Sequence, residues 1–527
     1  MSDTHSPYDI LNKGWKTTCR IVLGEEIGEL SDYKDWLLEY VPPSGKNRSH
    51  LSGKEVTLAM DSYCPCAKFV SSGESKETKH EPLSINQIKD IDSIAQAISE
   101  RWEYTGNRVL GNSSSVESSD LVMDSQFVSY SSNIQQSSYV FASAFARMGS
   151  KYIYGSHGFA QGEFLIRHCA GFNLKRQFET HFITDSSDLY FSFNCIGCSE
   201  LLFSFFQRNK HYCIGNLQLP KEAYASLKKK LLSEVASDLK KNKRFPSLFQ
   251  LVPNEKPPAS AAPSIPQSKP KEDMSVIDKA FSSTFKVIFH KEGGPIAPHE
   301  KWLSGQLLGI SEIKSPFGNS TWMPETRALF LFFTAPRNRI VSLAEGMELG
   351  KRHLEEGQLS SLPRIIENLG EIGYFTAEFQ DGSVTNAIST PVVYYSSNVY
   401  KALDATHSEY SGVASQILNS KYCFGGFRIM ESQFCLNCYN SLNLSRCLEV
   451  DTSEKCSDSL FCHNSEGLAE CMFCFNLKGK RYAIGNSPLP PQEYLKVKDS
   501  LLFQMADELE RKHSLPYNIF NIGCAGA

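Results

Sequence analysis

Sixteen cysteines carry the clearest chemical signal in this chain, and several stand at spacings that metal ions and redox reactions use. A C-x-x-C pair supplies two sulfurs from one turn of chain, which is half of a tetrahedral zinc site. Three such pairs occur, together with a C-P-C motif and two histidines that adjoin cysteines. These residues are Cys195 and Cys198, Cys435 and Cys438, Cys471 and Cys474, Cys64 and Cys66, His168 with Cys169, and Cys462 with His463.

The chain contains one unit twice in tandem. Residues 19–37 resemble residues 285–303 at a constant offset of 266, and Trp36 matches Trp302. Residues 209–232 resemble residues 479–502 at an offset of 270. Two distant blocks that recur in the same order indicate a tandem duplication of a unit of roughly 250 residues.

The duplication bears on the cysteines, because no complete ligand set occurs in both copies. Cys195 and Cys198 align with Ser465 and Leu468, and the C-x-x-C pairs of the second copy align with Leu165, His168, Leu201 and Ser204. A free cysteine packs as a small hydrophobe. We therefore expect core thiols, with no catalytic, cofactor-binding or metal-binding residue. The alternative is a zinc or iron site in the second copy, for which the candidate ligands are Cys435, Cys438, Cys462, His463, Cys471 and Cys474.

A reactive thiol is a third hypothesis. Cys64 and Cys66 are its best candidates because they stand outside the regularly spaced cysteines, although a buried turn is the preferred interpretation for them. The chain contains no P-loop, no G-x-G-x-x-G after a strand, no H-E-x-x-H and no G-x-S-x-G. These absences count against the common nucleotide-binding, zinc-protease and hydrolase classes.

The second part of each copy has the pattern of stacked strands. Short apolar segments separated by Gly, Ser, Asn and Asp begin about every 12 residues, which is a strand and turn spacing of solenoids. Cys423, Cys447 and Cys471 recur at intervals of 24 residues. We therefore predict a right-handed β-solenoid of about three 24-residue coils in each copy, with these cysteines stacked in its core. A pentapeptide-like or irregular coil is the alternative.

An amphipathic helix should follow each solenoid. Pro220 and Pro490 precede its expected starts, and Pro246 and Pro516 mark its ends. Because unpaired strand edges template aggregation, we expect this helix to cap the open end of the solenoid.

A small α/β module should precede each solenoid. Alternation predicts a strand through Cys19, Ile21 and Leu23, and its counterpart runs through Phe285, Val287 and Phe289. Helices are expected at Ser84–Arg101 and Ile340–Glu356. A linker with six prolines, Leu251–Met274, should make few tertiary contacts. The predicted domains are the α/β modules 1–125 and 275–392, the solenoids with their caps 126–250 and 393–527, and the linker 251–274.

Charge and hydropathy argue against nucleic acid and membrane as partners. The net charge of −4 gives no general attraction to phosphate or anionic lipid. The basic run from Lys228 to Arg244 has an acid-containing counterpart at 498–513, so we interpret it as a solvated helix face. The longest apolar stretch, Ala328–Phe333, is too short to span a bilayer, and the N-terminus has no apolar core of signal-peptide length. We expect a cytoplasmic protein with mostly reduced cysteines.

Residues 453–494 and 192–224, each with its Y-x-I-G-N ending, resemble the Cys-rich repeats of uncharacterised proteins from archaea and candidate-phyla bacteria. The resemblance covers roughly 90 residues of each copy and supports the repeat interpretation. The N-terminal zinc ribbons usual in the bacterial proteins have no match here, so the resemblance implies neither zinc binding nor an activity.

The sequence as a whole favours a non-enzymatic scaffold that presents solenoid faces to a protein partner. The alternative is a metal-binding protein or an enzyme whose site lies in the second copy.

Overall fold

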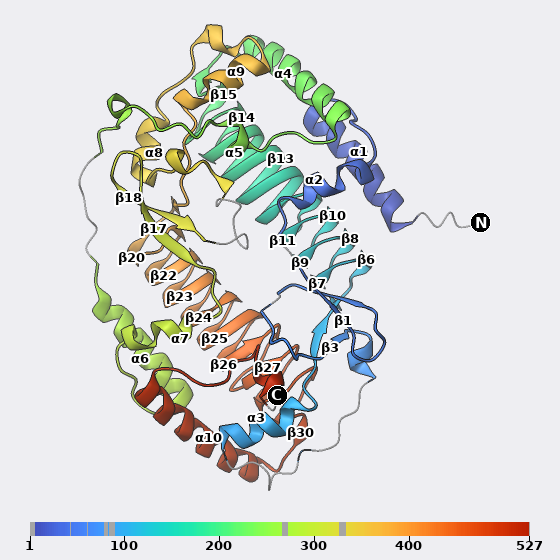
Figure 1. Cartoon of the computed structure of the whole chain (residues 1–527), viewed down its shortest axis with the longest axis vertical. Helices are drawn as coiled ribbons and strands as arrows, with labels where there is room; N and C mark the ends of the chain where they lie inside the picture. Colours follow the sequence, from blue (N-terminus) through green and yellow to red (C-terminus); the bar gives the residue numbers. More distant parts are fainter. Residues whose placement is uncertain are drawn as a thin grey trace. The chain divides into compact units, whose positions relative to one another are not determined.

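The computed structural model describes residues 6–42, 44–60, 62–77, 83, 90–265, 272–325 and 334–525. The chain divides into two compact units of three segments each. The first unit comprises Met1–Ser44, Asn107–Gln267 and Gly309–Phe379, and the second comprises Gly45–Gly106, Ser268–Leu308 and Gln380–Ala527. The fold is a mixture of helices and mostly parallel β-sheet in both units (Figure 1).

The two units interleave along the sequence, whereas the predicted domain boundaries follow sequence order. Segment 45–106 of the first copy belongs with the strands of the second copy, and segment 309–379 of the second copy belongs with the strands of the first. Equivalent elements can be exchanged at low cost because each receiving surface was built for such a segment. The duplication therefore permits this reciprocal exchange, which no local sequence signal reveals.

The first element of each copy is a helix, so the strands predicted at 19–23 and 285–289 are wrong. Helix α1 (Pro7–Leu23) begins at a capping box in which Ser6 Oγ accepts the Asp9 amide, and it ends at Gly24 with φ of 88°. Cys19 and Leu23 are buried, four residues apart on one helical face, while Ile21 is 40% exposed. Five residues of alternation could not distinguish this face from a strand. The counterpart is α6 (Met274–Phe289).

The remaining elements of the α/β parts are short. The predicted helices are present in shortened form as α3 (Ile91–Ser99) and α8 (Leu343–Leu349), and residues 84–89 lie outside the described part of the chain. The other elements are η1 (Leu30–Tyr33), α2 (Lys34–Leu38), β1 (Gly45–Arg48), β2 (Glu55–Leu58), β3 (Phe69–Ser71), η2 (Glu74–Lys76) and β4 (Tyr104–Gly106), then η5 (Ala297–His299), α7 (Glu300–Leu303), β17 (Ile310–Lys314), β18 (Ser320–Pro324), η7 (Arg337–Arg339), η8 (Glu356–Leu359), α9 (Leu362–Asn368), η9 (Leu369–Glu371) and β19 (Phe379–Asp381).

Each unit contains a long ladder of mostly parallel strands (Figure 1). The first ladder comprises β5 (Val109–Leu110), β6 (Ser114–Glu117), β7 (Asp120–Met123), β8 (Gln126–Ser129), β9 (Ser132–Gln135), β10 (Ser138–Phe141), β11 (Ala144–Arg147), β12 (Lys151–Tyr154), β13 (His157–Ile196), β14 (Ser199–Leu202) and β15 (His211–Ile214), closed by antiparallel β16 (Leu217–Gln218). The second comprises β20 (Thr385–Ile388), β21 (Val392–Tyr394), β22 (Ser397–Thr406), β23 (Glu409–Leu418), β24 (Lys421–Met430), β25 (Gln433–Leu442), β26 (Ser445–Asp451), β27 (Leu460–His463), β28 (Ala469–Met472) and β29 (Arg481–Ile484), closed by antiparallel β30 (Ser487–Pro488).

Paired strands are offset by 12 residues, or by 13 in two pairs of the first ladder, so the predicted 24-residue coil is wrong. Cys423 pairs with Cys435, and Cys435 pairs with Cys447. In the first ladder Leu189 pairs with Leu201, which pairs with Cys213. The 12-residue spacing of apolar segments was the correct signal. The cysteines at 24-residue spacing occupy only some of the core positions that stack every 12 residues.

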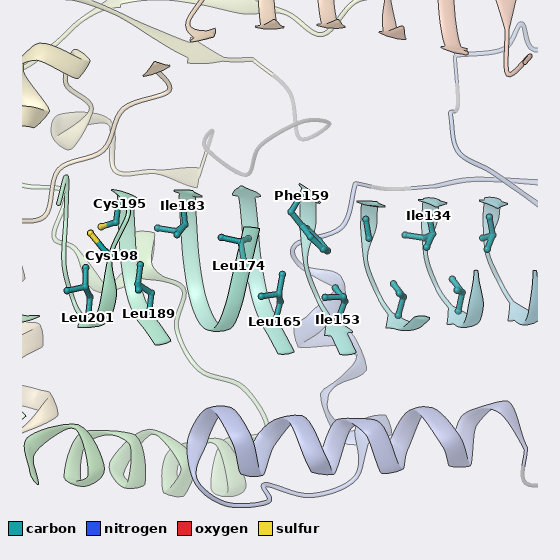
Figure 2. Close-up of a cluster of buried hydrophobic side chains, with 14 of the residues drawn as sticks. Ile134, Ile153, Phe159, Leu165, Leu174, Ile183, Leu189, Cys195, Cys198 and Leu201 are labelled. Atoms are coloured by element: carbon teal, nitrogen blue, oxygen red, sulfur yellow. The ribbon is translucent and has the colours of Figure 1, made fainter. Parts of the chain in front are cut away.

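Every third residue of the ladders points inward. Residues with left-handed backbone, such as Leu121, Asp124 and Phe127 with φ of 55°, 47° and 54°, recur at this interval and turn the chain before each inward position. The inward positions of the first ladder hold a column of buried apolar side chains, which Figure 2 shows from Ile134 to Leu201. A left-handed backbone costs roughly 1–2 kcal/mol for a residue with a side chain. The ladder hydrogen bonds and the packed interior offset that cost.

Serines alternate with apolar residues at many inward positions and connect successive strands. Ser131 Oγ donates to the Ser129 carbonyl at 2.8 Å and accepts the Ser143 amide at 3.1 Å. Ser143 makes the same contacts with Phe141 and Ser156. The buried hydroxyl thus satisfies two backbone groups at a turn, where strand pairing leaves them without partners.

The two predicted amphipathic helices are present as α4 (Lys221–Asn242) and α10 (Pro491–Lys512), each 22 residues long. Each binds its own ladder through an equivalent ion pair, Lys228 with Glu200 and Lys498 with Glu470, at 2.6 Å in both cases. None of the helices in the described parts of the chain is long and apolar enough to cross a membrane. The apolar stretch Ala328–Phe333 lies outside the described residues.

The first part of the proline-rich linker is not free of tertiary contacts. It begins within the short helix α5 (Leu248–Leu251) and contains the single turn η4 (Ala259–Ala261). The Pro253 carbonyl accepts from Arg339 Nε at 3.1 Å, and the Ala261 carbonyl accepts from Arg352 at 2.8 Å. Both arginines belong to segment 309–379, which lies in the same unit. Residues 266–271 of the linker are outside the described part.

Candidate metal centre

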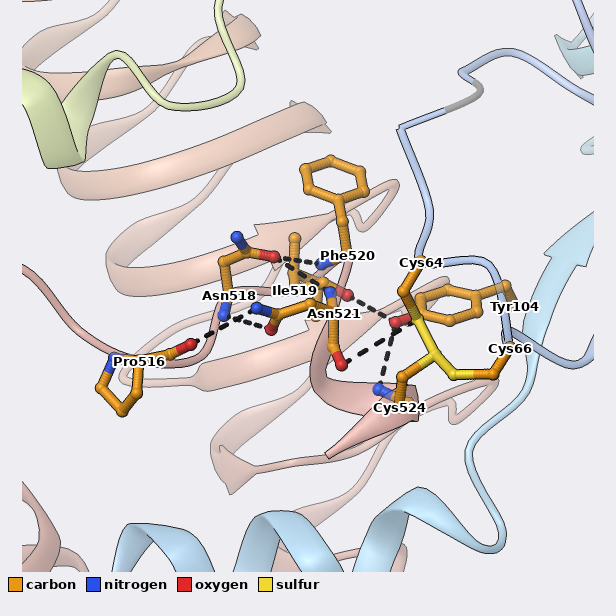
Figure 3. Close-up of a disulfide and its surroundings, with 10 residues drawn as sticks. Cys64, Cys66, Tyr104, Pro516, Asn518, Ile519, Phe520, Asn521 and Cys524 are labelled. Carbon is orange, nitrogen blue, oxygen red and sulfur yellow. Dashed lines mark hydrogen bonds between the residues drawn. A yellow bond between two sulfur atoms is a disulfide. The ribbon is translucent and has the colours of Figure 1, made fainter. Parts of the chain in front are cut away.

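Three cysteines meet at one point of the second unit. Cys64 and Cys66 lie in the loop between β2 and β3, and Cys524 lies in the final turn, η10 (Ile522–Cys524). Their sulfur atoms are all within 4.8 Å of one another, and Cys524 is joined to both of the others (Figure 3). One sulfur atom forms one disulfide at a time. The arrangement therefore represents either one disulfide beside a thiol, or three sulfurs around one ion.

The loop that carries Cys64 and Cys66 is bound to the C-terminal tail by its backbone. The Cys64 amide donates to the Phe520 carbonyl at 3.1 Å, and the Ala67 amide donates to the Cys64 carbonyl at 3.1 Å. The second bond closes a turn over Pro65 and Cys66. Both sulfurs of the C-P-C motif are thereby held on the side of the loop that faces the tail, as Figure 3 shows.

The tail is held in position by Tyr104 and Asn518. Tyr104 OH donates to the Ile519 carbonyl at 3.0 Å and accepts the Gly523 amide at 3.3 Å. Asn518 Oδ1 accepts the amides of Phe520 and Asn521, both at 3.0 Å. A Cβ atom at position 523 would lie 3.0 Å from side-chain atoms of both Trp102 and Tyr104, so a larger residue than Gly523 would have to displace these rings by a few tenths of an ångström. These contacts place Cys524 opposite the loop.

Aromatic rings pack between the loop that carries the thiols and a buried pair formed by Asp451 and His463. The Tyr63 ring packs on Tyr104 and Phe520, with ring centroids 4.5 and 5.4 Å away, and edge-on to His463 at 6.2 Å. His463 Nδ1 lies 2.9 Å from Asp451 Oδ2, and its Nε2 accepts the Thr105 amide at 3.1 Å. Because Nε2 accepts, Nδ1 carries the proton, and both ring nitrogens are already engaged. His463 is thus a positioning residue rather than a ligand.

A buried carboxyl group anchors the tail from the other side. Glu449 is fully buried, and its two oxygens accept the Ile519 amide and Asn437 Nδ2, both at 2.9 Å. Burial raises the pKa of Glu449 to about 8, and the two hydrogen bonds only partly counteract it. The equivalent residue in the first unit is Glu179, which accepts the Leu248 amide at 2.8 Å but also binds Arg167 Nε at 2.8 Å. The first unit therefore has an ion pair where the second has a lone carboxyl group.

The thiol cluster is suited to a soft metal ion. Thiolates favour Zn²⁺, Cu⁺ and iron–sulfur clusters over hard cations. Three sulfurs each about 2.3 Å from one zinc ion would stand roughly 3.8 Å apart. This lies inside the 4.8 Å within which the three sulfurs converge, but Cys524 must separate from Cys64 and Cys66 to bind an ion. Cys66 is exposed and the other two are half-buried, so an ion can enter from solvent. Among the described residues this is the one group of three histidine, cysteine or acidic side chains that converges tightly enough to hold an ion.

The cysteines that the sequence offered as metal ligands lie in the core of the second ladder. Cys435, Cys438, Cys462, Cys471 and Cys474 are all buried there together with apolar residues. Each Sγ approaches the carbonyl two residues earlier, as Cys435 does with Gln433 at 3.4 Å. The C-x-x-C spacing has a simple cause, because its two sulfurs occupy consecutive inward positions of a ladder in which every third residue points inward.

The other candidates occupy equivalent structural positions. Cys195 and Cys198 belong to the core column of the first ladder, as Figure 2 shows. His168 is buried beside Thr180, 2.8 Å from its hydroxyl, and burial lowers its pKa. Cys169 Sγ lies 3.8 Å from His157 Nδ1. These pairs are partners within the ladder and bring together no set of three ligands.

Sequence reasoning singled out Cys64 and Cys66 but missed their partner. Cys524 is 458 residues from Cys66 and belongs to no motif. The available signal was its position outside the ladder pattern, which it shares with the C-P-C motif. No family model, no curated protein and no solved structure matches this chain.

Proposed function

We propose that this protein is a non-enzymatic scaffold whose second unit binds a thiophilic metal ion, Zn²⁺ in the first instance, through Cys64, Cys66 and Cys524. The observation that carries the proposal is the convergence of three sulfurs from two ends of the unit. A bound metal deprotonates its thiol ligands, and its positive charge offsets most of the charge of three thiolates that would otherwise repel one another. A disulfide would leave one of the three sulfurs unused.

The cysteine distribution supports metal binding in a reducing compartment, and a cytoplasmic location is part of the proposal. Thirteen cysteines are free, including neighbours stacked directly across strands such as Cys423 and Cys435. Free thiols at this density are typical of the cytosol, where disulfides are rare and clustered cysteines more often bind metal.

The scaffold component rests on the ladders. We propose that each ladder is a β-solenoid, that α4 and α10 serve as caps, and that the outer faces bind a protein partner. The packed interiors leave the surfaces as the place for recognition. Nucleic acid is a poor candidate because lysines of the basic run are paired within the first unit: Lys228 with Glu200, Lys240 with Glu25 and Lys243 with Asp32.

Metal analysis of the full chain tests the proposal. Protein purified without chelator should contain about one zinc per chain, because three thiolates can hold one ion whose fourth position is taken by water or another donor. The variant C64S/C66S/C524S should lose the metal and remain folded, because these side chains are partly exposed. The matched control C435A/C438A removes two core thiols and should keep the metal. If the metal persists in C64S/C66S/C524S and is lost from C435A/C438A, the site lies in the ladder and the assignment is refuted.

A second candidate function is thiol–disulfide exchange at the same three residues. The Cα atom of Cys524 lies 6.5 Å from that of Cys64 and 5.9 Å from that of Cys66, and both distances suit a disulfide. Mass spectrometry of rapidly alkylated protein distinguishes the two. One disulfide and one modified thiol in metal-free protein purified under reducing conditions would favour exchange.

A further inference from the structure

We infer that metal binding at Cys64, Cys66 and Cys524 latches segment 45–106 onto the second unit and thereby controls whether this segment stays attached there. The inference rests on the proposed function, since it assigns a regulatory role to the same site. Because the two copies exchange segments, segment 45–106 packs on a ladder that is distant from it in the sequence, and specific contacts must hold it there.

One end of the segment has its own strong attachments to the second ladder. Thr105 donates its amide to His463 and its hydroxyl to Asn476 Oδ1 at 2.6 Å. The Leu83 amide donates to Ser487 Oγ at 2.7 Å. Trp102 packs on Phe475 with ring centroids 5.0 Å apart. This end is secured by ordinary hydrogen bonds and by packing.

The loop that carries Cys64 and Cys66 contacts the ladder directly through Met60, which accepts from Asn440, and through Tyr63, whose hydroxyl donates to Asp451 Oδ2 at 3.4 Å. Its remaining attachment runs through the C-terminal tail. Its backbone bond from Cys64 ends on Phe520, and the thiols end on Cys524. The tail is bound to the ladder by the lone buried carboxyl of Glu449 through Ile519. Loop, metal, tail and Glu449 therefore form one connection, and removing the metal weakens its step between loop and tail, where the Cys64–Phe520 backbone bond remains.

The first unit provides a natural comparison within the same chain. Its exchanged segment, 309–379, contains no cysteine, and none occurs anywhere between Cys213 and Cys423. The tail residue equivalent to Ile519 is Leu248, whose amide is held by Glu179 in an ion pair with Arg167. The first unit thus has a permanent electrostatic anchor, while the second combines a weaker anchor with three thiols. This asymmetry favours a controllable attachment in the second unit.

Hydrogen exchange of the full chain, read by mass spectrometry, tests the latch. Zinc-loaded protein is compared with the same protein after chelator treatment and desalting, and metal content is measured on both samples. Removing the metal should raise amide exchange about tenfold or more in residues 62–72 and 516–525, because local opening becomes easier. Peptides from 337–349 and from the ladder core should not change.

Two variants keep the test decisive. C66S changes the exposed sulfur alone and should give the metal-free exchange pattern even when zinc is present. C447A removes a core thiol and should preserve both metal content and the zinc-dependent protection. If zinc binds to the three thiols but exchange in both regions is unchanged by its removal, the latch is refuted and the proposed function stands. If no metal binds, both are refuted.

Discussion

Replacing Glu449 by glutamine should remove a pH dependence from the stability of the second unit. The Glu449 carboxyl is fully buried, and burial raises its pKa to about 8. The unfolded chain loses this proton near the ordinary value of 4.5, whereas the folded chain keeps it until about pH 8. Between these two values the folded state binds more protons than the unfolded state. Stability is therefore greatest below pH 4.5 and falls as the pH rises toward 8.

The size of the effect follows from the width of that window. Each pH unit contributes about 1.4 kcal/mol, so the free energy of unfolding should fall by at most roughly 5 kcal/mol across it. Glutamine has nearly the shape of the protonated acid. The glutamine oxygen can accept the Ile519 amide. If the side-chain amide of Asn437 flips, the glutamine Nε2 can donate to Asn437 Oδ1, an atom that has no hydrogen-bond partner in the wild type. E449Q should match the wild type at pH 5 and exceed it by several kcal/mol at pH 8.

The equivalent position in the first unit provides a control of opposite sign. Burial alone would raise the pKa of Glu179, but the charge of Arg167, with hydrogen bonds from His181 and Arg167, lowers it to about 2. This group stabilises the fold above pH 4.5, and the contribution is lost as the pH falls toward 2. E179Q removes the buried carboxylate of the pair and leaves Arg167 only the partly exposed Glu39 as an acidic partner, so it should cost up to about 3–5 kcal/mol at pH 7.

Denaturant-dependent hydrogen exchange measures each unit separately. Peptides from β25 and β26 monitor the second ladder, and peptides from β13 monitor the first. The difference between E449Q and wild type should grow from pH 5 to pH 8 in the second ladder, and E179Q should weaken the first at pH 7. A constant difference across that range, or a loss of stability in E449Q at pH 8, would refute the assignment of a neutral buried carboxyl at this position.

Three further predictions concern the ladders and the linker. S131A should cost about 1–3 kcal/mol in thermal or chemical unfolding, because it leaves the Ser143 amide buried without an acceptor, while S114A at an exposed position should be neutral. C447S should cost less than about 1 kcal/mol, because its hydroxyl can donate to the Ser445 or Cys456 carbonyl that the thiol now approaches, and loss of metal in this variant would contradict the core role. Limited proteolysis should cut between 262 and 273 rather than at the bound residues 253–261, and the two fragments should co-elute, because each unit contains segments from both sides of the cut.

The sequence was most informative where one physical cause repeats along the chain. Apolar segments every 12 residues predicted stacked strands, and the constant offsets predicted that helices such as α4 and α10 recur. The step from there to a 24-residue coil went wrong because cysteine occupies only some of the inward positions. The inward serines resemble turn residues in the sequence, although their spacing of three residues from the apolar positions marks them as part of the interior.

The parts that sequence could not supply are the long-range ones. Helix α1 looked like a strand because Cys19, Ile21 and Leu23 alternate, and only a longer window through Leu11 and Trp15 shows the helical face. The exchange of segments 45–106 and 309–379 could not be predicted from the sequence, because it depends on contacts between residues that are far apart along the chain. The sequence also does not predict that Cys524 meets the C-P-C motif, because this contact depends on how the C-terminal tail folds back over Tyr104.

The cysteines illustrate how position within a pattern separates packing from chemistry. A thiol at a ladder position has its surroundings dictated by the ladder, and burial raises the pKa of one such as Cys447, which keeps it protonated and inert. Strand pairing also fixes its distance from its neighbours, so four such thiols cannot gather around one ion without breaking the register. Cys64, Cys66 and Cys524 lie off the ladder, on a loop and a tail that can adjust to a ligand. The regular cysteines therefore indicate a core, and the irregular ones indicate a site.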